Sequence, residues 1–143
     1  MLKGIPPIFS PELIKILMEM GHGDEICIAD GNFPSGTYGK RVVRMDGHNI
    51  PEILSAVLDF FPLDSFYEAP VILMAVPTEI LPEPEIWKTY HEIIVKSDEG
   101  KVFKAFKHID SSAFYKRAEK CYAVIASSEQ TLGANIILRK GII

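Results

Sequence analysis

Short, wholly apolar runs alternate along this chain with amphipathic segments that open on helix-start signals. The clearest run covers 70–76 (PVILMAV), seven residues without a charged or hydrogen-bonding side chain. A strand that is apolar at every position is usually covered on both faces, as in parallel sheets flanked by helices. Strands that alternate with helices of about 10–15 residues predict an α/β fold. We therefore expect three layers, α/β/α, with a mostly parallel sheet in the middle.

Capping and turn residues predict where the helices and strands begin and end. Ser10-Pro11-Glu12 starts a helix with a hydroxyl cap, a proline and an acid in the first turn, and Gly21 ends it. Further helices are predicted over 49–61, over 84–96 and from Ser111 or Ser112 to Lys120. Strands are predicted over 25–29, 40–45, 70–76, 101–109, 121–126 and 135–139. The Gly- and Pro-rich stretch 30–39 predicts a loop.

Length and charge exclude several classes of protein. The chain has 143 residues, which fits one domain over 1–143, and its net charge of −4 argues against nucleic-acid binding. No apolar run approaches the ~20 residues of a membrane span, and the N-terminal stretch lacks the apolar core of a signal peptide. Cys27 and Cys121 lie inside apolar runs, which favours reduced core cysteines in a cytoplasmic protein.

The densest polar cluster surrounds the first predicted strand. His22 stands between two glycines before this strand, and Asp30 and Asn32 follow its carboxyl end. Ligands of α/β proteins bind outside the carboxyl ends of the strands, and histidine suits proton transfer near neutral pH. His22 could instead be an exposed residue of a helix-ending turn. Asp30, likewise, could be a solvated turn residue.

Two other residues carry polar groups that could bind a ligand such as a neutral polyol: Tyr115, in the first turn of the helix after the predicted strand 101–109, and Asn135, at the start of the last predicted strand. The Asn135 amide offers both a donor and an acceptor, and the Tyr115 hydroxyl can do either. Asn135 could instead be a turn residue whose amide caps the backbone, and Tyr115 could instead pack in the core beside Phe114. His22, Asp24 and Asp30 make only a weak metal site, because no second histidine follows at helical spacing. No dinucleotide or phosphate-loop motif is present, so we expect neither a cofactor nor a metal.

The motifs together resemble those of a known family. They are Ser10-Pro11-Glu12-Leu13, 19–25 (EMGHGDE), Ala29-Asp30, Asn32-Phe33-Pro34, 44–47 (RMDG), Pro62-Leu63-Asp64, 113–118 (AFYKRA) and 135–141 (NIILRKG). This set is similar to the L-fucose mutarotase branch of the D-ribose pyranase family and covers nearly the whole chain. The GHGDE segment with its following Asp and NFP is the most specific part.

The resemblance implies a three-layer α/β/α protein that interconverts anomers of a free monosaccharide, with L-fucose as the expected sugar, without a cofactor. It also implies a ring-shaped homo-oligomer, a pentameric ring or a decamer of two stacked rings. His22 corresponds to the proton-transfer residue and Asp30 to a sugar-binding residue. Asp64 and Tyr115 match further site residues, with Tyr115 a possible partner of His22 in acid–base catalysis. Gly133, Ala134 and Asn135 match a motif that binds substrate across a subunit boundary.

Two departures from the family pattern concern substrate binding. The family's tyrosine is Gly133 here, and its basic residue before the Phe-Tyr helix is Ser111. His108, Lys107 or Tyr38 could compensate from nearby. If Gly133 leaves a wider pocket, Gly133→Tyr should tighten sugar binding, provided that the backbone there does not need positive φ. The departures also motivate an alternative function, a non-catalytic sugar-binding protein of the same fold.

Overall fold

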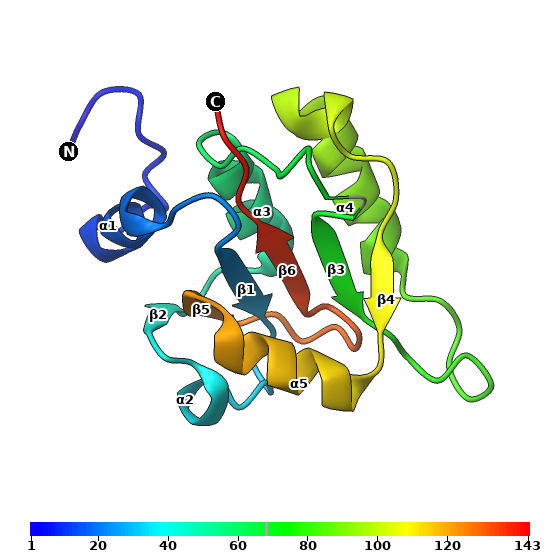
Figure 1. Ribbon diagram of the computed structural model, residues 1–143. Helices are drawn as coiled ribbons and strands as arrows, with labels where there is room; N and C mark the ends of the chain where they lie inside the picture. The colour runs from blue at the N-terminus through cyan, green and yellow to red at the C-terminus, as the bar shows by residue number, and fades with distance from the viewer. Residues whose placement is uncertain (68) are drawn as a thin grey trace.

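The structure, a computed structural model, describes residues 1–67 and 69–143. At its centre lies a six-stranded sheet with strand order β2-β5-β1-β6-β3-β4 (Figure 1). The strands are β1 (Glu25–Ala29), β2 (Val42–Met45), β3 (Val71–Met74), β4 (Lys107–Ile109), β5 (Ala123–Ser127) and β6 (Ile136–Arg139).

One strand of the sheet, β6, runs in the opposite direction to the other five. β6 runs antiparallel to its neighbours β1 and β3, whereas the other neighbouring pairs are parallel. The predicted mostly parallel sheet is therefore confirmed. The carboxyl ends of β1 to β5 meet at one edge, here called the carboxyl edge, where β6 begins. β6 ends at the opposite edge, called the amino edge, where β1 starts and where both termini lie (Figure 1).

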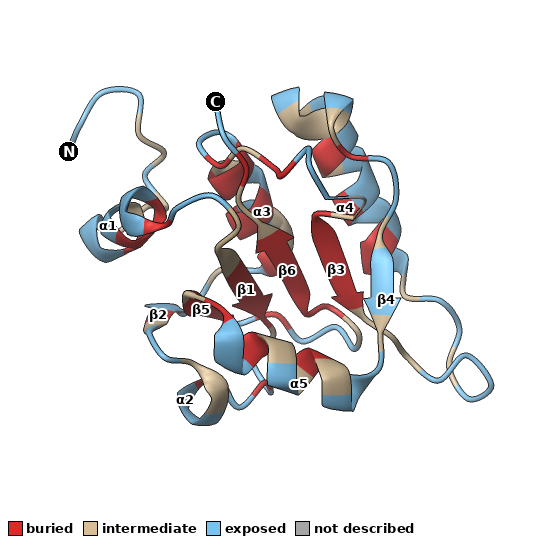
Figure 2. Cartoon of the chain, in the orientation of Figure 1, coloured by how far each residue is buried: buried red, intermediate tan, exposed pale blue. Residues whose placement is uncertain are grey.

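Helices cover both faces of the sheet, which confirms the three layers. The helices are α1 (Pro11–Glu19), α2 (Ser35–Tyr38), α3 (Ile50–Leu58), α4 (Glu85–Lys96), η1 (Asp98–Lys101, a 3₁₀ turn) and α5 (Ser111–Lys120). α1, α3 and α4 bury apolar side chains in the larger core cluster on one face, and α5 packs in a second cluster on the other. Figure 2 shows the buried residues concentrated on the central strands β1, β6 and β3 and on the helix sides that face the sheet. None of the helices in the described ranges is long and apolar enough to cross a lipid bilayer.

The predicted helix starts rest on side-chain caps. The Ser10 hydroxyl accepts a hydrogen bond from the Leu13 amide at 3.1 Å. Asn49 and Glu52 form a reciprocal capping box at the start of α3. Both cysteines are free and buried, as predicted, and burial raises the pKa of both thiols. They are therefore unreactive core residues.

Two predicted segments are wrong. The 30–39 loop contains the short helix α2, and the 101–109 strand is reduced to Lys107–Ile109, preceded by η1. The rings of Phe103 and Phe106 pack together at 4.9 Å, and both also contact His91 on α4. The apolar residues before β4 therefore pack against a helix instead of alternating across a sheet. The other predicted elements are present, with ends that differ by at most three residues.

Candidate active site

The predicted site residues form two groups, one at each edge of the sheet. His22 and Asp64 lie together at the amino edge, and Asp30 and Asn135 lie together at the carboxyl edge. β1 separates the two groups, and its five residues span about 13 Å at about 3.3 Å per residue. His22 and Asp30 of one copy therefore lie too far apart to contact one small ligand together.

At the amino edge, the turn between α1 and β1 presents His22. Gly23 adopts a φ of +86°, and its amide donates to the Lys140 carbonyl at 2.8 Å, which ties this turn to the chain after β6. The His22 side chain is 44% exposed, and its Nε2 lies 3.2 Å from Oδ1 of Asp64. The Phe66 ring packs beside the imidazole, with 5.5 Å between ring centroids. His22 thus has one nitrogen held by the protein and an open face.

Asp64, predicted as a sugar-binding residue, is completely buried behind His22. Its Oδ1 also accepts from the Phe66 amide at 3.0 Å, and its Oδ2 accepts from Nε of Arg139 at 3.0 Å. Burial alone would raise the pKa of this carboxyl, but the hydrogen bonds from Phe66, His22 and Arg139 outweigh it and lower the pKa. Asp64 is therefore ionised, and both of its oxygens are engaged within the protein.

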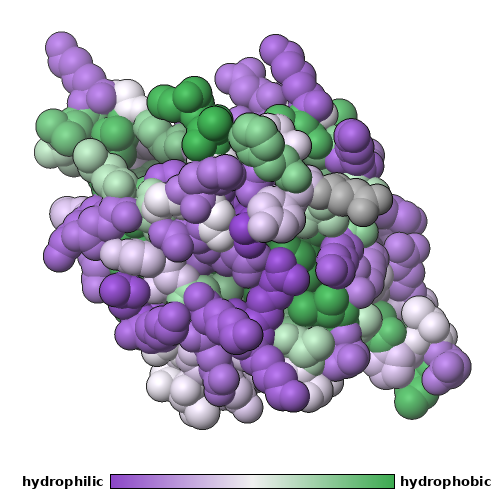
Figure 3. All heavy atoms as spheres, viewed as in Figure 1, coloured by the Kyte–Doolittle hydropathy of each residue, from purple (hydrophilic) through white to green (hydrophobic). Residues whose placement is uncertain are grey.

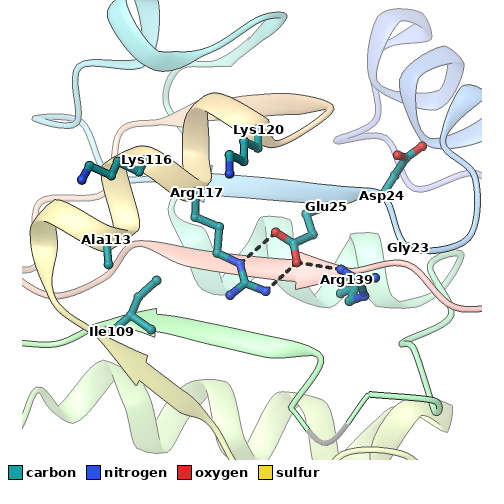
Figure 4. Close-up of a pocket in the computed structure, with 9 residues that line it drawn as sticks. All are labelled: Gly23, Asp24, Glu25, Ile109, Ala113, Lys116, Arg117, Lys120 and Arg139. Carbon is teal, nitrogen blue, oxygen red and sulfur yellow. Dashed lines mark hydrogen bonds and ion pairs between the residues drawn. The ribbon is translucent and has the colours of Figure 1, made fainter.

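An ionic network continues from Asp64 across the sheet. Arg139 donates to Glu25 at 3.3 Å, and Arg117 on α5 donates to Glu25 through two nitrogens at 2.9 and 2.7 Å. Figure 4 shows Glu25 between the two guanidinium groups. These groups line a pocket of about 560 Å³, which Lys116 and Lys120 also border.

No role was predicted from the sequence for Glu25, Arg117 or Arg139. Glu25 opens the apolar strand β1 and Arg139 closes the apolar strand β6, and the two are directly opposite in the antiparallel register. A charged residue at the end of a wholly apolar strand was the available signal. That Glu25 pairs with Arg139 is seen only in the folded sheet.

At the carboxyl edge, Asp30 and Asn135 hold each other in place. The Asp30 amide donates to Oδ1 of Asn135 at 2.8 Å, and Nδ2 of Asn135 donates to Oδ2 of Asp30 at 2.8 Å. Oδ1 of Asp30 accepts from the Asn32 amide at 2.9 Å. The sequence placed Asp30 at the ligand edge and Asn135 only at the start of the last strand. The antiparallel direction of β6 brings that start beside the end of β1.

Aromatic side chains gather near the same edge. Tyr115 stacks on Tyr38 with 4.9 Å between ring centroids and packs on Phe33 at 5.4 Å. Both tyrosines are half-buried, and within the described residues neither phenol oxygen has a hydrogen-bond partner. Ser111, the family's basic position, is exposed at the first position of α5. Tyr38, a candidate to compensate for the changes at Gly133 and Ser111, stacks directly on Tyr115.

The segment before Asn135 is held by α4. The Trp87 indole donates to the Gly133 carbonyl at 2.8 Å, and the Tyr90 hydroxyl donates to the Ala134 carbonyl at 2.7 Å. His108 packs its ring edge-on against Trp87 at 4.6 Å. These contacts fix the backbone that carries Asn135.

Gly133 has a positive φ, the backbone conformation that was expected to prevent Gly133→Tyr from tightening sugar binding. Its φ is +75°, and a Cβ there would lie 2.8 Å from Cγ1 of Val76 and 2.9 Å from Cγ of Pro84. A side chain at this position would be strained and crowded. The condition on which Gly133→Tyr was expected to tighten sugar binding is therefore not met, and Val76 and Pro84 already occupy the adjacent space.

Metal ligation has no support in the side-chain arrangement. Across residues 1–67 and 69–143, no group of three or more His, Cys, Asp or Glu side chains is placed to hold a metal ion. His22 and Asp30, two of the three residues considered as ligands, lie at opposite edges of the sheet.

Comparison with known proteins supplies the family. The model of the RbsD / FucU transport protein family matches residues 3–143. The chain belongs to the RbsD/FucU family. It is 44% identical to the fucose mutarotase of Mus musculus, with 98% of this chain and 94% of that protein covered. It is 43% identical to the L-fucose mutarotase of Histophilus somni, with 99% and 97% covered.

Solved structures of the family have the same fold. The fucose mutarotase of Streptococcus pneumoniae in complex with L-fucose matches with a TM-score of 0.91 and 43% identity, covering 99% of each chain. FucU from Bifidobacterium longum matches with a TM-score of 0.92 and 47% identity, also covering 99% of each chain. The resemblance seen in the sequence is confirmed.

Proposed function

We propose that this protein is a sugar mutarotase that interconverts the anomers of a free monosaccharide, with L-fucose as its substrate. The identity to fucose mutarotases over nearly the full length supports this function. The observation that carries it is the His22–Asp64 pair: a half-exposed imidazole hydrogen-bonded at 3.2 Å to a buried, ionised carboxylate. Such a pair presents a base of fixed orientation to a bound ligand.

The proposed chemistry needs only proton transfer. A base removes the proton of the anomeric hydroxyl while an acid protonates the ring oxygen, and the hemiacetal opens to an aldehyde. The aldehyde rotates about one bond and closes on its other face. No atom changes oxidation state between the two anomers, so the reaction requires no redox cofactor. With Nε2–H donated to Asp64, Nδ1 of His22 is the nitrogen available to the sugar.

The carboxyl edge supplies the groups that would hold the sugar. The mutual hydrogen bonds of Asp30 and Asn135 leave acceptor capacity on both side chains for sugar hydroxyls. The stacked rings of Tyr38 and Tyr115 offer an apolar wall, with free hydroxyls for the second proton transfer. We assign sugar binding to Asp30 and Asn135 and the acid role to Tyr115, and Ser111 and the Gly133-Ala134 backbone border the same region.

The separation of the two edges leads us to propose that the site forms between copies. The carboxyl edge of one copy would meet His22 of a neighbouring copy, in a ring that is a pentamer or a decamer of two rings. Exposed apolar residues surround the amino edge, among them Met1, Leu2, Met18, Ile142 and Ile143. Figure 3 shows hydrophobic residues gathered at the end of the molecule where the termini lie. Such a patch favours a protein interface. We place this assembly in the cytoplasm, where buried free cysteines persist.

Mixing two inactive variants tests both the reaction and the shared site. His22→Gln and Asp30→Asn are expected to lose exchange of L-fucose anomers, measured by saturation-transfer NMR. Co-assembled at equal amounts, they should regain about a quarter of the wild-type rate, because that fraction of two-copy sites is intact in a heterologous ring. No recovery in a verified mixed oligomer would contradict the shared site. Wild-type protein that binds fucose without exchange would instead be the non-catalytic sugar-binding protein.

A further inference from the structure

Arg139 lies between two carboxylates at the amino edge. Its Nε donates to Asp64 at 3.0 Å, and another of its nitrogens donates to Glu25 at 3.3 Å. The Tyr67 ring covers its guanidinium, whose central carbon lies 3.7 Å from the ring centroid. The side chain is only 19% exposed. Arg139 is therefore held on three sides, and its planar group has little freedom to turn.

The hydrogen bond from Arg139 determines which oxygen of Asp64 is left to contact His22. Arg139 occupies Oδ2 of Asp64, and the Phe66 amide and His22 share Oδ1. An ionised carboxylate with these partners accepts a hydrogen bond from Nε2 of His22 and does not donate one. The imidazole then carries its proton on Nε2, which leaves Nδ1 free.

We propose that Arg139 is a positioning residue: it holds Asp64 so that the His22 ring keeps one orientation and one tautomer. This inference deepens the proposed function and relies on His22 acting on the sugar. Arg139 itself is separated from His22 by Asp64. Its guanidinium also lies beside Gly23 in the turn that carries His22, but its hydrogen bond to the reaction's proposed machinery is to Asp64.

The other charged groups around the network supply a matched control. Glu25 on β1 binds Arg139 from one side and Arg117 on α5 from the other. Arg117 donates two hydrogen bonds to Glu25 and, in the described structure, none to Asp64. Arg117→Met thus removes a guanidinium from the same network without touching the Asp64–His22 pair. A general loss of charge or stability would affect both arginine variants, whereas loss of positioning would affect only Arg139.

The test compares Arg139→Met, Arg139→Lys and Arg117→Met in the full-length oligomer. The first readout is the ¹⁵N chemical shifts of the His22 ring in sugar-free protein, at a pH where the imidazole is neutral. Wild type and Arg117→Met should show Nε2 protonated and Nδ1 unprotonated, whereas Arg139→Met should show both tautomers. Arg139→Lys keeps the positive charge but loses the planar guanidinium, so it should lie between these states.

The second readout is the rate of fucose anomer exchange. Arg139→Met should lower kcat by about 10–100-fold, with KM nearly unchanged, as for other groups that orient a catalytic side chain. A single Nε2–H tautomer with wild-type kcat in Arg139→Met would overturn the proposal. If that variant does not fold, the same result in folded Arg139→Lys would overturn it. The ¹⁵N readout needs no turnover, so it tests the role of Arg139 even if the proposed function fails. Failure of the proposed function would show separately, as a His22→Gln variant that still exchanges fucose anomers.

Discussion

The two edges of the sheet hold polar residues in different ways. At the amino edge, Asp64, Arg139, Glu25 and Arg117 form a chain of charge-assisted hydrogen bonds in which Asp64 is fully buried. At the carboxyl edge, Asp30 and Asn135 form a reciprocal pair with a single charge, next to stacked aromatic rings. The first arrangement fixes an orientation. The second leaves hydrogen-bonding capacity for a ligand.

This difference matches the demands of acid–base chemistry and of sugar binding. A proton-transfer group needs a fixed tautomer and a stable charge environment, which buried ion pairs with good geometry provide. A sugar site needs donors and acceptors that are still available, together with an apolar surface for the ring. The comparison supports the proposal that His22 at the amino edge transfers a proton, and that Asp30 and Asn135 at the carboxyl edge bind the sugar.

The largest effect is expected for His22→Gln. Loss of the imidazole should slow fucose anomer exchange by about 10²–10⁴-fold, the usual contribution of a general acid or base. His91→Gln, an exposed histidine on α4, is the control and should retain the wild-type rate. Saturation-transfer NMR measures both variants. A folded His22→Gln protein with a near wild-type rate would remove proton transfer from the amino edge.

Asp64→Asn should cost stability at neutral pH. Breaking a buried ion pair on one side costs about 3–5 kcal/mol, and Asp64 is fully buried between His22 and Arg139. Since folding lowers the pKa of Asp64, its ionised form stabilises the protein above the unfolded value near pH 4. That contribution disappears as the pH falls through the folded value.

Urea unfolding at several pH values checks this prediction. The difference in the free energy of unfolding between wild type and Asp64→Asn should be largest near pH 7 and shrink below about pH 4. A difference that stays constant over this range would show that the Asp64 charge does not stabilise the amino edge.

At the carboxyl edge, Gly133→Ala should destabilise the fold by about 1–3 kcal/mol, because φ there is +75° and the added Cβ meets Val76 and Pro84. Gly36→Ala is the matched control, since its Cβ would meet nothing within 4 Å and its φ is not positive. Thermal unfolding of both variants measures the cost. Equal stability of the two variants would mean that the segment carrying Asn135 relaxes easily.

The smallest effect is expected for Tyr115→Phe, which keeps the ring stacked on Tyr38 and removes only the hydroxyl. If this hydroxyl protonates the ring oxygen, kcat should fall by about ten-fold, near the lower limit for acid–base groups because a water can substitute. Tyr38→Phe removes the neighbouring hydroxyl and should have less effect on kcat. An unchanged kcat in Tyr115→Phe would restrict the carboxyl edge to binding.

The sequence alone determined the elements that depend on local chemistry. The apolar strands, the Ser10 and Asn49 caps and the positions of His22, Asp30 and Asn135 at strand ends were all predictable from spacing and residue type. Residues 101–106 were wrongly predicted as strand, because Phe103 and Phe106 pack against His91 on α4. An apolar pattern does not say which neighbour will cover it.

Tertiary structure alone decided which of these residues act together. The direction of β6 brings Asn135 to Asp30 and Arg139 to Glu25, although their separations in sequence exceed 100 residues. It also places His22 and Asp30 at opposite edges, although eight positions separate them in the chain. Local propensity fixes where a strand begins and ends. Its direction and neighbours come from burial of both faces of the whole sheet, which no short segment encodes.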